Sequence, residues 1–112
     1  MVSAGHPFEG RELEGSIRVE REDQQTVLRL AGEIDMEVVE QVEDLNDWRP
    51  PVVDAIDAGG VTFLSSIGVG YLIRVLERSR AQGRSAVLRS VSPSAERVFA
   101  RTGLTEMFGL SE

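Results

Sequence analysis

One stretch of twenty residues near the middle of the chain, from Asp57 to Leu76, most constrains how the chain folds. Its pattern is typical of the end of a buried strand, a tight loop and the first turns of an amphipathic helix. Ser65 and Ser66 stand where that helix is expected to begin. A serine there can cap the helix by accepting a bond from a free backbone N–H. It is also a position where added negative charge meets the positive end of the helix dipole. These residues alone leave both interpretations open.

Hydrophobic periodicity along the rest of the chain predicts four strands and three main helices. The strands are expected over 16–21, 26–31, 52–57 and 86–90, and the helices over 36–46, 66–82 and 93–102. The apolar segment 104–110 is expected to form a helical turn. This order, β-β-α-β-α-β-α, predicts an α/β fold with a small mixed β-sheet and helices packed mainly on one face. The first two strands should form an antiparallel hairpin, and the second and third should run parallel with a right-handed crossover between them.

The ends of the predicted helices follow from capping residues. Asp35 is a suitable N-cap for the first helix, and Ser92 followed by proline is a typical start for the third. Gly83 and Gly103 are natural C-terminal stops. The apolar stripe of the longest helix predicts the most buried side chains, namely Leu72, Val75 and Leu76.

The length of 112 residues fits one domain. Residues 1–13 are polar and without periodicity, so we expect a flexible N-terminal tail followed by a single domain over 14–112. No apolar run reaches the roughly 18 residues that a membrane span needs, and no signal-peptide pattern begins the chain. We therefore expect a cytoplasmic protein with no membrane insertion.

The charge and the residue types exclude several classes of function. A net charge of −7 argues against binding nucleic acid, whose phosphates would be repelled. There is no cysteine, and the single histidine, His6, has no partner for a zinc site, so no metal or cofactor is expected. Three aspartates, Asp35, Asp54 and Asp57, lack the histidine or lysine that would complete a catalytic constellation. We therefore do not expect an enzyme.

The glycines of the central stretch do not match a nucleotide-binding loop. Gly59-Gly60 and Gly68-x-Gly70 have neither the Walker spacing nor the dinucleotide-binding spacing. Gly68 and Gly70 are instead expected to allow the helix to pack closely against the sheet or a partner.

Three motifs in order resemble those of the STAS domain family. Residues 32–35 (Gly-Glu-Ile-Asp) resemble its Gly-Glu-hydrophobic-Asp signature. Residues 57–70 resemble its Asp-x-Ser-x-Val-x-Phe-hydrophobic-Asp-Ser-Ser-Gly-x-Gly segment. Residues 92–93 (Ser-Pro) and 102–104 (Thr-Gly-Leu) resemble its C-terminal helix boundaries. The resemblance covers about residues 15–110, and within the family it is greatest to bacterial anti-sigma factor antagonists.

This resemblance implies a regulated binding module. It implies that an anti-sigma factor serine kinase, with a histidine-kinase-like ATPase fold, phosphorylates Ser66 and that a serine phosphatase reverses the reaction. Ser65 is the second choice of acceptor. The unphosphorylated protein would bind the kinase and release a sigma factor. The partner-binding residues that it implies are Asp35, Asp57, Ser65, Ser66, Ile67 and Gly68.

The chain departs from the family pattern at three places. Ser65 replaces the aspartate expected before the phosphorylated serine, and Ile67 replaces the small residue expected after it. The segment between Asp35 and Val52 is also shorter than usual. The alternative is therefore a STAS subunit that is never phosphorylated and belongs to a larger assembly, either a lipid-transport complex or a stress-signalling particle. A nucleotide-binding STAS domain is a third and weaker alternative.

Overall fold

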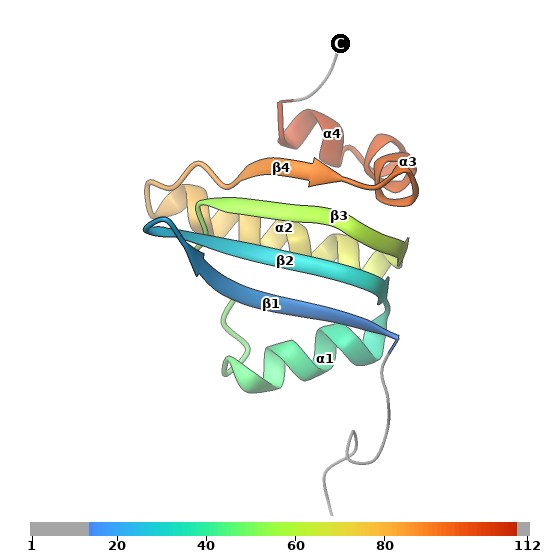
Figure 1. The fold of residues 1–112 in the computed structure, drawn as a ribbon, viewed down its shortest axis with the longest axis horizontal. Coiled ribbons are helices and arrows are strands. Elements are labelled where there is room, and N and C mark those ends of the chain that lie inside the picture. Colours follow the sequence, from blue (N-terminus) through green and yellow to red (C-terminus); the bar gives the residue numbers. More distant parts are fainter. Residues whose placement is uncertain (1–13, 110–112) are drawn as a thin grey trace, which may run out of the picture.

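The structure is a computed structural model that describes residues 14–109. Its centre is a four-stranded sheet with the strand order β1-β2-β3-β4 (Figure 1). The strands are β1 (Gly15–Glu22), β2 (Gln25–Ile34), β3 (Ala55–Leu64) and β4 (Val87–Val91). The helices are α1 (Met36–Leu45), α2 (Ser66–Ala81), α3 (Pro93–Thr102) and α4 (Leu104–Met107). The expected flexible tail and His6 lie outside the described residues.

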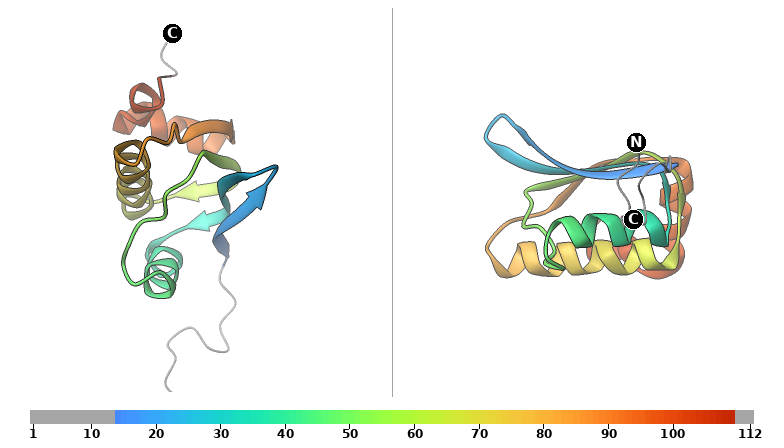
Figure 2. Two further views of the ribbon diagram at one scale, coloured as in Figure 1. Left: turned by 90° about the vertical axis from the view of Figure 1, so that its left-hand side faces the viewer. Right: turned by 90° about the horizontal axis from the view of Figure 1, so that it is seen from below.

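The sheet is mixed, as predicted. β1 and β2 are antiparallel, whereas β3 runs parallel to both β2 and β4. Asp23 and Gln24 form the hairpin turn, and both have positive φ angles, 48° and 67°. A two-residue turn of this kind matches the right-handed twist of the strands that it joins. α1 and α2 lie together on one face of the sheet, while α3 and α4 lie by the β4 edge (Figure 2).

The apolar side chains of the sheet and α2 form the core. Leu72, Val75 and Leu76 are each 0% exposed, which confirms the predicted buried face of this helix. Phe99 of α3 stacks on Phe108, with ring centroids 5.6 Å apart. The short helix α4 confirms the helical turn expected near the C-terminal end, within the described residues.

The third strand differs most from the prediction. We expected a strand over 52–57 and then a tight loop, but β3 begins at Ala55 and continues to Leu64. Glycine in a strand normally marks an irregularity, and here the register of β3 against β2 shifts between Asp57 and Gly60 without ending the pairing. The lack of a side chain at Gly60 allows this close approach to β2, because a Cβ there would lie only 3.2 Å from the Ala31 Cβ. Only Ser65 separates β3 from α2.

Candidate functional site

β2 and β3 are parallel neighbours, so both lead into helices at the same edge of the sheet, where the carboxyl ends of these strands lie, on the right in Figure 1. Each junction consists of one residue, Asp35 between β2 and α1 and Ser65 between β3 and α2. Both residues are N-caps. The Asp35 carboxylate accepts the Val38 N–H at 3.2 Å, and the Ser65 hydroxyl oxygen accepts the Gly68 N–H at 3.1 Å.

Ser65 also ties the two junctions together. Its backbone N–H and its hydroxyl both donate to the carbonyl of Ile34, at 3.0 and 2.8 Å. The hydroxyl of Ser65 is therefore used once as a donor and once as an acceptor. A Cβ on Gly68 would lie 2.7 Å from Leu64 Cδ1 and 3.0 Å from Ile34 Cγ2. The predicted close packing of Gly68 is confirmed, and this glycine has a structural role here.

The prediction of close packing against the sheet is wrong for Gly70. The nearest atom to a Cβ built there is an Arg74 guanidinium nitrogen at 3.7 Å, which is ordinary van der Waals contact. Gly70 lies on the part of α2 that has space around it, so the sheet does not require a glycine at this position.

Ser66 differs from Ser65 in every structural respect. It is the first residue of α2 and is exposed, as predicted. Its hydroxyl has no hydrogen bond to any residue between 14 and 109. A group that needs to enter the active site of another protein must be accessible and free of internal bonds, and of these two serines only Ser66 meets both conditions.

Exposed apolar side chains surround this edge of the sheet. Met36 begins α1, Phe63 lies near the end of β3, and Ile67 follows Ser66; they are 50, 52 and 42% exposed. We call these three residues, with Asp35 and Ser66, the junction surface. The sequence identified Asp35, Ser66 and Ile67 but missed Met36 and Phe63. The sequence signal that could have identified them is an apolar residue at a strand end or at the first position of a helix; in the part of the chain that the structure describes, both stay about half exposed.

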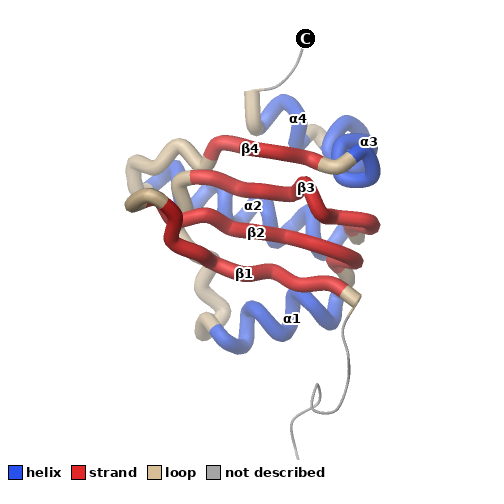
Figure 3. The backbone as a smooth tube through the Cα atoms, in the orientation of Figure 1, coloured by secondary structure: helices blue, strands red, loops and turns tan. Residues whose placement is uncertain are grey.

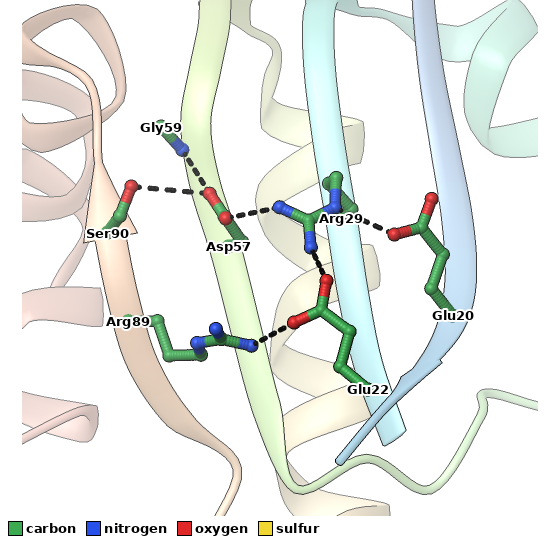
Figure 4. A network of polar contacts seen from close by, with 7 residues as sticks. All are labelled: Glu20, Glu22, Arg29, Asp57, Gly59, Arg89 and Ser90. Atoms are coloured by element: carbon green, nitrogen blue, oxygen red, sulfur yellow. Dashed lines mark hydrogen bonds and ion pairs between the residues drawn. The ribbon is translucent and has the colours of Figure 1, made fainter. Parts of the chain in front are cut away.

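Asp57 lies elsewhere. It is seven positions before Leu64 on β3, which corresponds to roughly 20 Å along the strand. Its side chain belongs to a polar network on the sheet surface (Figure 4). Its carboxylate accepts bonds from Arg29 at 2.6 Å, from the Gly59 N–H at 2.9 Å and from the Ser90 hydroxyl at 3.2 Å. The structure therefore separates Asp57 from the other residues of the expected partner-binding set.

Arg29 connects this network across the strands. Besides Asp57, it pairs with Glu20 at 2.9 Å and with Glu22, and Arg89 of β4 reaches Glu22 at 3.0 Å. The Gly59 N–H, with help from Ser90 and Arg29, holds the pKa of Asp57 below its ordinary value against the opposing effect of burial. The bond from Arg89 does the same for the pKa of Glu22.

Asp54, the remaining aspartate considered for chemistry, has its own partners. It accepts the Thr26 N–H at 2.8 Å and an Arg84 guanidinium N–H at 2.7 Å, and these bonds lower its pKa. Within residues 14–109 no group of three or more histidine, cysteine or acidic side chains is arranged to hold a metal ion. None of the helices described is long and apolar enough to cross a membrane.

Comparisons with known proteins agree with this fold. The family model described as "Mlab, STAS domain" matches residues 17–110. An anti-sigma factor antagonist from Mycobacterium paratuberculosis has a similar crystal structure, with a TM-score of 0.67 and 26% identity over 85% of this chain and 83% of that one. The anti-sigma factor antagonist SpoIIAA in its unphosphorylated form is also similar, with a TM-score of 0.63 and 26% identity over 81% of this chain and 84% of that one.

Proposed function

This chain belongs to the STAS domain family, and from that premise we propose that it is an anti-sigma factor antagonist switched off by phosphorylation of Ser66. It binds an anti-sigma factor serine kinase in the bacterial cytoplasm and thereby regulates sigma-factor-dependent transcription. It is a binding module and not an enzyme. The observation that carries the proposal is the exposed hydroxyl of Ser66, which bonds to no other described residue and lies among the exposed apolar side chains of the junction surface.

The apolar part of the junction surface supplies the contact with the kinase. Met36, Phe63 and Ile67 are the side chains whose burial by a partner removes apolar area from water. Such residues at the centre of an interface contribute most of the binding free energy. Asp35, beside them, is bonded to its own helix and keeps Met36 in place.

Phosphate at Ser66 acts on this contact through charge. It adds about −1.5 to −2 charges at neutral pH. The chain already carries −7. Because Ser66 stands at the positive end of the α2 dipole, the phosphate is tolerated within the domain itself. Binding of the kinase would then require removal of water from a phosphate dianion, which is costly. Docking is therefore lost without a change of fold.

The test uses the purified chain with each candidate kinase of the histidine-kinase-like ATPase fold that the same genome encodes. Intact mass after incubation with ATP should show one added phosphate in the wild type and in Ser65→Ala, and none in Ser66→Ala. Ser66→Ala should still bind the kinase, since its side chain is small and neutral. Ser66→Asp should bind measurably worse, though less so than the phosphoprotein, because one carboxylate carries less charge than phosphate.

The matched pair of serines makes the outcome decisive. Labelling that is lost in Ser65→Ala and kept in Ser66→Ala would move the site by one residue. Binding of the phosphoprotein as tight as that of the unmodified protein would overturn the switch.

A second function is favoured by the departures at Ser65 and Ile67 and by the name of the matching family model. In that case the chain is a STAS subunit of a larger assembly and is never phosphorylated. Its junction surface would then be buried permanently by a neighbouring subunit. A chain that accepts no phosphate from any kinase encoded nearby, and that co-purifies stoichiometrically with transporter or particle subunits, would establish this alternative.

A further inference from the structure

A small pocket lies between β3 and α3, on the side of β3 that faces away from β2. β4 pairs with β3 only as far as Val91 opposite Ala58, so the last residues of β3 have no strand neighbour on that side. α3 packs against β3 in its place. The space between them has a volume of about 220 Å³. Its lining residues are Thr62, Phe63, Leu64, Ser94, Arg97, Val98 and Arg101.

The helical half of this lining is one stripe of α3. Ser94, Arg97, Val98 and Arg101 follow the i, i+3, i+4, i+7 spacing that places side chains on one helix face. Arg97 and Arg101 are therefore neighbours of like charge, an arrangement that by itself disfavours the helix slightly. Neither has an ion-pair partner among the described residues, and no carboxylate lines the pocket.

Some other arginines of the chain are neutralised by ion pairs, whereas exposed ones such as Arg78 and Arg80 have no ion pair among the described residues. Arg29, Arg84 and Arg89 each pair with a carboxylate. A second, larger cavity also contains arginines, but there Glu77 is part of the lining and Arg74 is paired with Glu43 of α1. The α3 pocket is thus a concentration of two unpaired positive charges on a chain whose total charge is −7.

We propose that this pocket binds a small phosphate monoester. Two guanidinium groups from adjacent turns of one helix face can each donate paired hydrogen bonds to phosphate oxygens, and Thr62 and Ser94 contribute hydroxyl donors to the same lining. Phe63 and Val98 provide an apolar wall for the esterified group. The volume lies below the roughly 300–1,000 Å³ of sites for drug-sized ligands, so the pocket accommodates one phosphate and one small ring or chain.

The test is a titration of the full-length chain with phenyl phosphate, followed by ¹H–¹⁵N NMR in phosphate-free buffer. Backbone signals of Thr62 and Ser94 and the side-chain signals of Arg97 and Arg101 should shift together and saturate. Inorganic phosphate should give the same pattern with weaker affinity, because it lacks the ring, and phenol should give none. Shifts that spread over the surface without saturating would overturn the proposal.

Two variants with the same change in charge separate a site from general attraction. R97Q/R101Q should weaken binding by at least about tenfold for each guanidinium lost. R78Q/R80Q, which removes two exposed arginines from α2, should leave the affinity within about twofold of the wild type. Ser94→Ala, which keeps both charges, should weaken binding by a few-fold. Equal losses in the two arginine variants, or no loss in R97Q/R101Q, would refute the site.

Discussion

The two ends of β3 differ in whether the side chains around them have partners within the chain. Around Asp57 each charged side chain of the network has partners, from Gly59 and Ser90 to Arg29. At the far end, around Ser66, a hydroxyl is exposed without a bond and apolar side chains face water. The polar groups of the first region are bonded within the chain, whereas the exposed groups of the second region are accessible to another molecule.

This contrast separates two kinds of residue that one sequence motif brings together. Asp57 and Ser66 belong to the same stretch, yet the Asp57 side chain stabilises the sheet surface, whereas the Ser66 side chain bonds to none of residues 14–109. We expect substitutions at the two ends of β3 to separate stability from binding. The effects below are ordered from the largest to the smallest.

Leu72→Ala sets the scale, because this side chain lies in the core that both regions share. It is 0% exposed, and a large-to-small substitution at such a site should lower the free energy of unfolding by about 2–5 kcal/mol. Chemical denaturation measures the change. An unmoved midpoint would mean that α2 buries another face. The effects at the two ends of β3 could then not be compared with that of a core substitution.

Ser65→Ala should lower the free energy of unfolding by about 1–2 kcal/mol, since it removes an N-cap and a bond to the Ile34 carbonyl. The backbone N–H of residue 65 still donates to that carbonyl, which limits the loss. The same denaturation experiment gives the value. A change below about 0.3 kcal/mol would show that the cap is not structural.

Asp57→Asn should cost about 1 kcal/mol at pH 7, as expected for a partly exposed ion pair with supporting hydrogen bonds. The pKa of Asp57 is lowered in the folded state, so the ionised group stabilises the fold above its ordinary pKa of about 3.9 and loses that contribution as the pH falls. The difference between wild type and variant should therefore shrink between pH 7 and pH 2. Kinase binding at pH 7 should not change; a difference that grows with acid would reverse the assignment.

Ser66→Ala should change the free energy of unfolding by less than about 0.5 kcal/mol, because an exposed hydroxyl without partners contributes little. Thermal unfolding of Ser65→Ala and Ser66→Ala side by side isolates the effect of one position. If Ser66→Ala destabilised the chain as much as Ser65→Ala, the hydroxyl of Ser66 would have a structural role and the contrast between these neighbours would fail.

The helix boundaries were accessible from sequence because caps are local. The side chains of Asp35 and Ser92 accept bonds three residues ahead, as their positions predicted, and Gly103 has the left-handed φ of 85° that ends α3. The extent of β3 was not accessible, because Gly59 and Gly60 lack strand propensity and the strand continues through them only by pairing with β2, which resumes at Gly60 opposite Ala31.

The candidate site was predictable only in part. The motif indicated the neighbourhood of Ser66, but it did not indicate that the Ser65 hydroxyl donates to the carbonyl of Ile34, which lies 31 positions earlier. Likewise, no periodic pattern places Asp57 on the sheet surface away from Ser66, and the pocket of Arg97 and Arg101 depends on how α3 packs against β3. Each of these features is a tertiary contact, which local sequence does not encode.

The one-residue junctions at Asp35 and Ser65 constrain how the length of this chain can vary. An insertion or deletion at either position would rotate the following helix by about 100° and turn its apolar face away from the sheet. The connections at the opposite edge, residues 46–54 and 82–86, are longer, and residues 46–49 and 82–85 within them are exposed (Figure 3). Length variation among homologues, inserted tags and circular permutation sites should therefore be confined to that edge.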